Sequence, residues 1–92
     1  MKIVFDEEAL DDLRRIFAWI TKDNPHAAAN VITRIFNRIE LLASPALTYM
    51  GHPGRDPGTL ELIEAPYVVV YEVSRLHRKI IVLSIVHRAQ DR

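Results

Sequence analysis

The chain has 92 residues, and its 12 basic side chains balance its 12 acidic ones. The hydrophobic fraction of 49% excludes a disordered chain, and the absence of cysteine excludes disulfide scaffolds, thiolate zinc sites and cysteine nucleophiles. No apolar run is long enough to span a bilayer and the N-terminus lacks a signal-peptide core, so we expect one cytoplasmic domain over residues 1–92, with no cofactor and no membrane contact.

A short strand and an amphipathic helix are expected first. Residues 3–5 form a short apolar run, and Asp6 can cap a helix because its carboxylate can accept the free N–H groups of a first turn. Apolar residues then recur at three- and four-residue spacing as far as about Lys22, which is typical of one helix face. This stripe consists of Leu10, Leu13, Phe17 and Ile20, with Ala9 and Ile16 beside it.

A second helix is expected from the Asn24-Pro25 pair, because asparagine is a good N-cap and proline suits the first helical position. It should end near Ala43, since Pro45 disfavours helical angles in the residue before it. The connection between the helices is only a few residues long. We therefore expect an antiparallel two-helix hairpin.

Residues 44–58 are predicted to form a loop, because they hold all three glycines and three of the five prolines. Three strands are expected after it, over residues 59–64, 67–74 and 79–87. The fold class is therefore predicted to be α+β: a short N-terminal strand, a helical hairpin and a three-stranded antiparallel meander.

The strand over residues 67–74 is apolar on both faces, since Val68 and Val70 lie opposite the tyrosine-bearing face. Two helices cover one face of a small sheet, so an exposed apolar face is expected, which usually marks a partner site. Alternatively, the loop folds over this face with Leu47, Tyr49 and Met50 as a lid. Trp19 lies off the centre of the first helix stripe, and the sequence leaves open whether it widens the core or lines a partner groove.

Only one group of residues suggests catalysis. His87 and Arg88 end the last predicted strand, and with Arg55 they could in principle cleave RNA, with an imidazole to move a proton and guanidinium groups to hold phosphate. A His-Arg pair is common by chance, and a histidine at a strand end is more often a packing or surface residue. The histidines have no metal-ligand spacing, so we expect neither a catalytic nor a metal site.

The charge is unevenly distributed. Residues 1–12 carry five acidic side chains against one basic, whereas residues 75–92 carry five basic side chains against one acidic. The basic end could meet a partner or could simply be solvated. A net charge of zero is not typical of a nucleic-acid-binding protein, so we expect no direct specific nucleic-acid binding.

Taken in order, several segments resemble the ParE/RelE toxin superfamily of bacterial toxin–antitoxin systems, and within it the ParE branch. They are DEEALDDL (6–13), NPHAA (24–28), GR (54–55) with GTLEL (58–62), PYVVVYEV (66–73) and VHRAQDR (86–92). The resemblance covers nearly the whole chain. It implies a helical hairpin on a small antiparallel sheet, and a ParD-like antitoxin whose C-terminal segment wraps the toxin and would cover the apolar face.

RelE-like members of the superfamily are ribosome-dependent mRNA endonucleases, whereas ParE-like members poison DNA gyrase. Val68 stands where RelE-like nucleases commonly carry arginine, and the C-terminal tyrosine of many nucleases is missing. Neutral charge also suits the ribosome poorly. Leu60 departs from the family pattern, because arginine is common there, and this puts any role of that arginine in doubt.

The resemblance therefore implies a gyrase inhibitor that is not an enzyme. The expected gyrase-binding residues are Arg88, Gln90, Asp91 and Arg92, and the expected antitoxin-binding residues are Trp19, Tyr49, Val68 and Val70. Two alternatives remain open: a RelE-like ribosome-dependent endonuclease that uses His87, Arg88 and Arg55, or an inactive homologue that only binds antitoxin.

Overall fold

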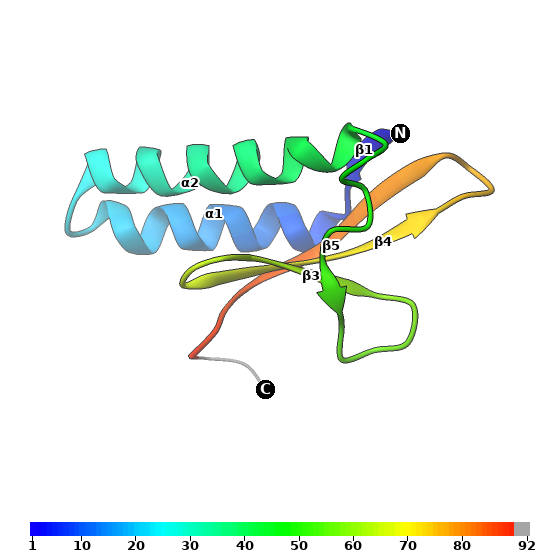
Figure 1. Ribbon diagram of the computed structural model, residues 1–92. Coiled ribbons are helices and arrows are strands. Elements are labelled where there is room, and N and C mark those ends of the chain that lie inside the picture. The colour runs from blue at the N-terminus through cyan, green and yellow to red at the C-terminus, as the bar shows by residue number, and fades with distance from the viewer. Residues whose placement is uncertain (90–92) are drawn as a thin grey trace.

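In the computed structural model, which describes residues 1–89, a helical hairpin packs on one face of a five-stranded sheet (Figure 1). The elements in chain order are β1 (Lys2–Phe5), α1 (Glu7–Thr21), α2 (Pro25–Glu40), a 3₁₀ turn η1 (Leu41–Ala43), β2 (His52–Pro53), β3 (Leu60–Glu64), β4 (Tyr67–Ser74) and β5 (Lys79–His87). The predicted α+β class is confirmed, and the sheet order is β1-β5-β4-β3-β2. No helix in the described part of the chain is long and apolar enough to cross a membrane.

The two helices begin differently. The Asn24 side chain accepts a hydrogen bond from the N–H of Ala27 at 3.1 Å, as predicted for an N-cap. Asp6 also stands at an N-cap, but the prediction that its carboxylate caps the first turn is wrong. Its backbone N–H instead donates to the carbonyl of Val82 at 2.9 Å, which ties the start of α1 to β5.

The sheet contains the predicted antiparallel meander of β3, β4 and β5, and β1 joins it in parallel with β5. The loop predicted over residues 44–58 contains a short strand, β2, in which His52 pairs with Glu61 and Pro53 with Leu60. Proline is tolerated there because β2 is an edge strand. Gly58, whose φ is +84°, supplies the left-handed conformation that the turn into β3 requires.

A β-bulge interrupts the pairing of β4 with β5. Val70 pairs with Ser84 and Tyr71 with Val82, which leaves Leu83 as the extra residue. Because strand side chains alternate between faces, one extra residue reverses which face each later side chain takes. Val82 and Ile85 therefore both join the core beneath the helices.

The prediction of an exposed apolar face is wrong for Val68, which is 3% exposed, whereas Val70 is only half-buried. Val68 is flanked by Ile63 in β3 and by Val86 in β5, so neighbouring apolar side chains share its face. The lid alternative is not confirmed for Met50 and Tyr49. Met50 packs against the core that contains Val69 and Tyr71, which is not the face of Val68 and Val70, and Tyr49 is exposed.

Tyr71 fastens the loop to the sheet. Its buried hydroxyl donates to the carbonyl of Thr48 and accepts from the N–H of Gly51, both at 3.0 Å. A Cβ on Gly51 would lie only 2.8 Å from that hydroxyl oxygen, so the backbone can approach the ring only because residue 51 is glycine. Burial raises the pKa of Tyr71 above its ordinary value of 10.0, and the hydrogen bond from Gly51 lowers it by less.

We expect Tyr71→Phe to lower the free energy of unfolding by about 1–3 kcal/mol, because two backbone groups lose a buried partner. The raised pKa of Tyr71 adds a pH signature. In the unfolded chain the hydroxyl ionises first, so the native protein should lose stability as the pH rises above about 10, and Tyr71→Phe should lose less. Urea unfolding at pH 7 and above pH 10 measures both effects. Equal stability of the two proteins at pH 7 would contradict the fastening role.

Candidate partner-binding groove

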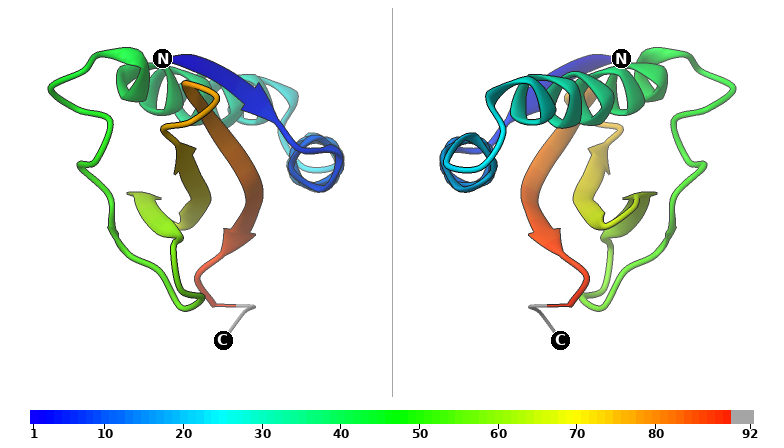
Figure 2. Two further views of the ribbon diagram at one scale, coloured as in Figure 1. Left: turned by 90° about the vertical axis from the view of Figure 1, so that its right-hand side faces the viewer. Right: turned by 90° about the vertical axis from the view of Figure 1, so that its left-hand side faces the viewer.

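A groove of about 570 Å³ lies between α1 and the end of β5. It exists because β1 pairs with β5 only as far as Val82, so the rest of β5 is an open edge that α1 flanks (Figure 2). Its lining residues are Asp12, Arg15, Ile16, Ala18, Trp19, Ile20, Lys22, Tyr67, Ile85, Val86 and His87. The groove thus combines an apolar floor with two basic side chains, Arg15 of α1 and Lys22 just after it, and with the carboxylate of Asp12.

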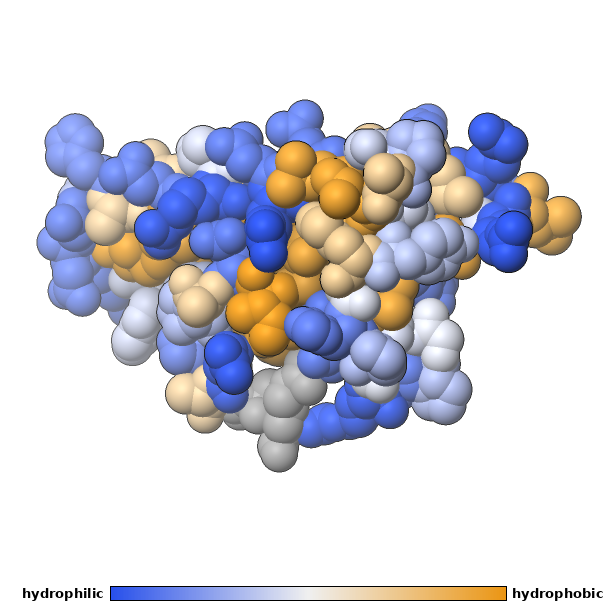
Figure 3. Space-filling view, viewed as in Figure 1, coloured by the Kyte–Doolittle hydropathy of each residue, from blue (hydrophilic) through white to orange (hydrophobic). Residues whose placement is uncertain are grey.

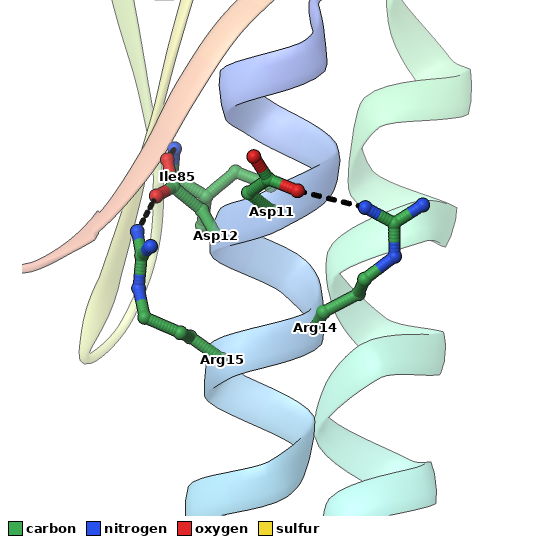
Figure 4. Close-up of polar contacts among 5 residues, drawn as sticks. All are labelled: Asp11, Asp12, Arg14, Arg15 and Ile85. Carbon is green, nitrogen blue, oxygen red and sulfur yellow. Dashed lines mark hydrogen bonds and ion pairs between the residues drawn. The ribbon is translucent and has the colours of Figure 1, made fainter.

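Asp12 holds α1 against the open strand edge (Figure 4). Asp12 is buried, with 6% of the residue exposed, and its Oδ2 accepts a hydrogen bond from the N–H of Ile85 at 2.8 Å. The other oxygen forms an ion pair with Arg15, whose side chain is exposed. The N–H of Ile85 faces away from β4, and without Asp12 it would be a buried, unsatisfied donor.

The sequence-based prediction missed Asp12, which reads as one of a run of solvated acids. A signal was present, because residue 12 falls three positions after Ala9 and four before Ile16, both of which face the core or its edge. Phe17, predicted to be in the buried stripe, is instead 44% exposed. The buried face of α1 is therefore rotated towards Asp12 relative to the prediction.

Trp19 belongs to the groove and not to the core, which resolves the alternative left open by the sequence. It is 71% exposed, and the Nζ of Lys22 lies 5.5 Å from the centre of its ring. Tryptophan is among the residues that contribute most to binding when a partner buries them. An exposed tryptophan with a neighbouring cation is thus a suitable anchor for a partner segment.

His87 lines the inner end of the groove as a packed side chain. Its ring stands edge-on to Tyr67, with ring centroids 5.4 Å apart, and its Nδ1 accepts the N–H of Ala89 at 3.0 Å. Arg55 lines a smaller hollow of about 110 Å³ beside β3, β4 and β5, and Val86 lines both this hollow and the groove. Arg88 is exposed, and its backbone N–H donates to the carbonyl of Pro66 at 2.8 Å. His87 and Arg55 therefore do not share a cavity.

The structure separates the four residues expected to bind antitoxin. Trp19 lines the groove, Val70 lines the smaller hollow, Tyr49 is 55% exposed in the loop, and Val68 is buried. Three of the expected gyrase-binding residues, Gln90, Asp91 and Arg92, lie outside the described residues. Within residues 1–89 no three histidine or carboxylate side chains gather as a metal site would require.

Comparison with known proteins agrees with the fold. The family model described as "ParE toxin of type II toxin-antitoxin system, parDE" matches residues 3–92. The chain is 41% identical over 86 residues to "Putative toxin Y4kP" of Sinorhizobium fredii, an alignment that covers 90% of this chain and 83% of that protein.

Solved structures share the architecture at lower identity. A chain of the chromosomal ParDE toxin–antitoxin system of P. aeruginosa superposes with a TM-score of 0.81 at 23% identity, covering 95% of each chain. A chain of the RelBE2 complex of Mycobacterium tuberculosis gives 0.59 at 24% identity, covering 95% and 96%, and the isolated E. coli RelE toxin gives 0.60 at 20% identity, covering 98% and 86%. The chain therefore has the RelE/ParE fold and belongs to the ParE toxin family of type II toxin–antitoxin systems.

Proposed function

We propose that this toxin inhibits DNA gyrase by protein–protein contact and is neutralised by a ParD-like antitoxin. The observation that carries the proposal is an open, apolar groove, together with catalytic candidates that do not gather in one pocket: His87 lines the groove and Arg55 lines the adjoining hollow, with Val86 in the wall of both. Acid–base cleavage of RNA requires the proton-transfer and phosphate-binding groups to converge on one substrate. Inhibition through a binding surface requires no such convergence.

The groove suits one segment of an antitoxin. Its apolar floor includes Ile16 and Ile85, and its basic side chains, Arg15 and Lys22, would attract carboxylates. An amphipathic, acidic segment would bury Trp19 and pair with Lys22, whereas Arg15 already pairs with Asp12. The P. aeruginosa relative comes from a ParDE system, which supports a ParD-like partner here.

The gyrase contact is assigned to the end of the chain. Arg88 is exposed immediately after β5, and the residues that follow, Gln90, Asp91 and Arg92, are polar. Arginine is a common anchor at protein interfaces, and a polar tail offers charge and hydrogen bonds, whereas the groove offers apolar area. Two different surfaces would therefore serve the target and the antitoxin.

DNA supercoiling by purified gyrase tests the proposal. The toxin should block supercoiling or trap gyrase on cleaved DNA, and addition of antitoxin should restore the activity. Deletion of residues 90–92 should weaken inhibition and leave antitoxin binding intact. If supercoiling stays normal at high toxin concentration while translation stops, the gyrase assignment is wrong and the RelE-like alternative replaces it.

His87→Ala distinguishes the two mechanisms further. We expect toxicity to survive, because His87 packs on Tyr67 and shares no cavity with Arg55. Loss of a true proton-transfer group would cost about 10²–10⁴-fold in rate. Growth inhibition after induction provides the measurement, and Arg55→Ala is the companion variant. Cleavage of mRNA on ribosomes that disappears in His87→Ala would contradict the expectation.

A further inference from the structure

The turn between β4 and β5 gathers positive charge at the end of β5 opposite the groove. Arg75, Arg78 and Lys79 are all exposed there, and Lys2 of β1 is the register partner of Lys79. The hairpin projects beyond the helices (Figure 1), and hydrophilic side chains flank an apolar protrusion at this end of the molecule (Figure 3). Four cations from two segments thus form one basic tip.

Within residues 1–89, no acidic side chain forms an ion pair with a cation of this tip. The ion pairs of the described chain involve Arg14, Arg15 and Arg38, and none involves the four cations of the tip. Like charges directly opposite each other on neighbouring strands are unfavourable, and Lys2 and Lys79 stand in that relation. An anionic partner would relieve the repulsion between these cations.

Arg78 has a further unfavourable feature. Its φ is +53°, which makes it the one non-glycine residue of the described chain with a positive φ. Glycine adopts this conformation without steric cost, whereas a side chain with a Cβ does not. A strained position occupied by arginine points to a use for the guanidinium group.

Leu76, at the tip itself, is 87% exposed. One leucine is too small an apolar surface to anchor the protein in a membrane. A two-stranded β-ribbon, however, fits the major groove of duplex DNA, where its apolar tip can rest against base edges and neighbouring cations reach the phosphates. The combination of a ribbon, four unpaired cations and an apolar tip matches this partner.

We propose that the hairpin tip, made of Lys2, Arg75, Leu76, Arg78 and Lys79, binds the phosphate backbone of duplex DNA without sequence specificity. The contact does not depend on gyrase, and it lies at the opposite end of β5 from the antitoxin groove. Because the whole chain has a net charge of zero, the binding is weak and salt-sensitive. On a DNA-bound target, it would add a second attachment for the toxin.

Fluorescence anisotropy with the purified full chain and a short labelled duplex tests the proposal between about 50 and 200 mM salt. Four phosphate contacts predict a slope of log affinity against log salt of about −3.6. Arg78→Gly should reduce the magnitude of that slope by about one while its thermal stability is equal or higher, so lost binding cannot be attributed to misfolding. Leu76→Ser should lower affinity without changing the slope.

The triple variant Arg75→Gln, Arg78→Gly, Lys79→Gln should abolish binding, whereas Arg34→Gln, which removes an exposed cation from α2, should leave it unchanged. Three results would overturn the proposal: no binding of the duplex at low salt, binding by the triple variant equal to that of the natural chain, or equal competition by polyglutamate. The last would assign the tip to an acidic protein surface.

Discussion

Trp19→Ala is expected to weaken antitoxin binding by about 30- to 1000-fold, a loss of about 2–4 kcal/mol. The side chain is 71% exposed in the groove and would become a buried anchor in the complex. Since it contributes little to the core of the toxin, the free energy of unfolding should change by no more than about 0.5 kcal/mol. Isothermal titration calorimetry with a purified ParD-like antitoxin that binds the toxin measures the loss.

Two comparisons test whether the loss of antitoxin affinity arises in the groove. Leu76→Ala removes an equally exposed apolar side chain at the opposite end of β5 and should leave antitoxin affinity unchanged. Trp19→Ala should still inhibit gyrase, because the proposed target contact lies in the tail. Unchanged antitoxin affinity in Trp19→Ala would show that the antitoxin binds outside the groove.

Asp12→Ala is expected to destabilise the toxin by about 2–3 kcal/mol, because the N–H of Ile85 loses a charged, buried acceptor. For a chain of this size, that corresponds to a fall in Tm of about 10–20 °C. The ion pair with Arg15 adds little, since the arginine side chain is mostly in solvent. Thermal unfolding followed by circular dichroism provides the measurement.

Two further substitutions separate the effect of the hydrogen bond between Asp12 and Ile85 from the effect of removing a negative charge from α1. Asp12→Asn keeps an oxygen that can accept the N–H of Ile85 and should cost less than alanine does. Asp11→Ala removes an exposed carboxylate of α1 that pairs with Arg14, and should cost at most about 0.5 kcal/mol. If Asp12→Ala costs no more than Asp11→Ala, Asp12 does not stabilise the edge of β5.

Periodicity and turn residues were enough to predict both helices and the three longer strands, and β4 and β5 have the predicted bounds. These elements are determined locally, by apolar spacing, Asn24-Pro25 and the cluster of glycine and proline. The bulge at Leu83 is not determined locally, because it depends on how β4 and β5 align. Val68 was misjudged for the same reason, since its burial depends on neighbouring strands.

The site was less predictable than the fold. Trp19 was recognised as a candidate from its position beside the helix stripe, but the groove exists because β1 stops pairing at Val82. Asp12 could be distinguished from its solvated neighbours only once an unpaired N–H of β5 was known to lie beside it. Composition and spacing identify side chains, whereas a strand edge is a property of the assembled sheet.

The pairing of β1 with β5 also affects when the toxin becomes complete during synthesis. Lys2 pairs with Lys79 and Phe5 with Val82, so β1, which leaves the ribosome first, cannot pair until β5 has been synthesised. Such distant contacts form slowly, because the intervening chain must be closed into a loop first. Until β5 emerges, a nascent chain lacks the strand that joins β1 to β4, and the groove lacks one wall. An incomplete toxin would therefore present neither a finished fold nor the groove in which we propose that the antitoxin binds.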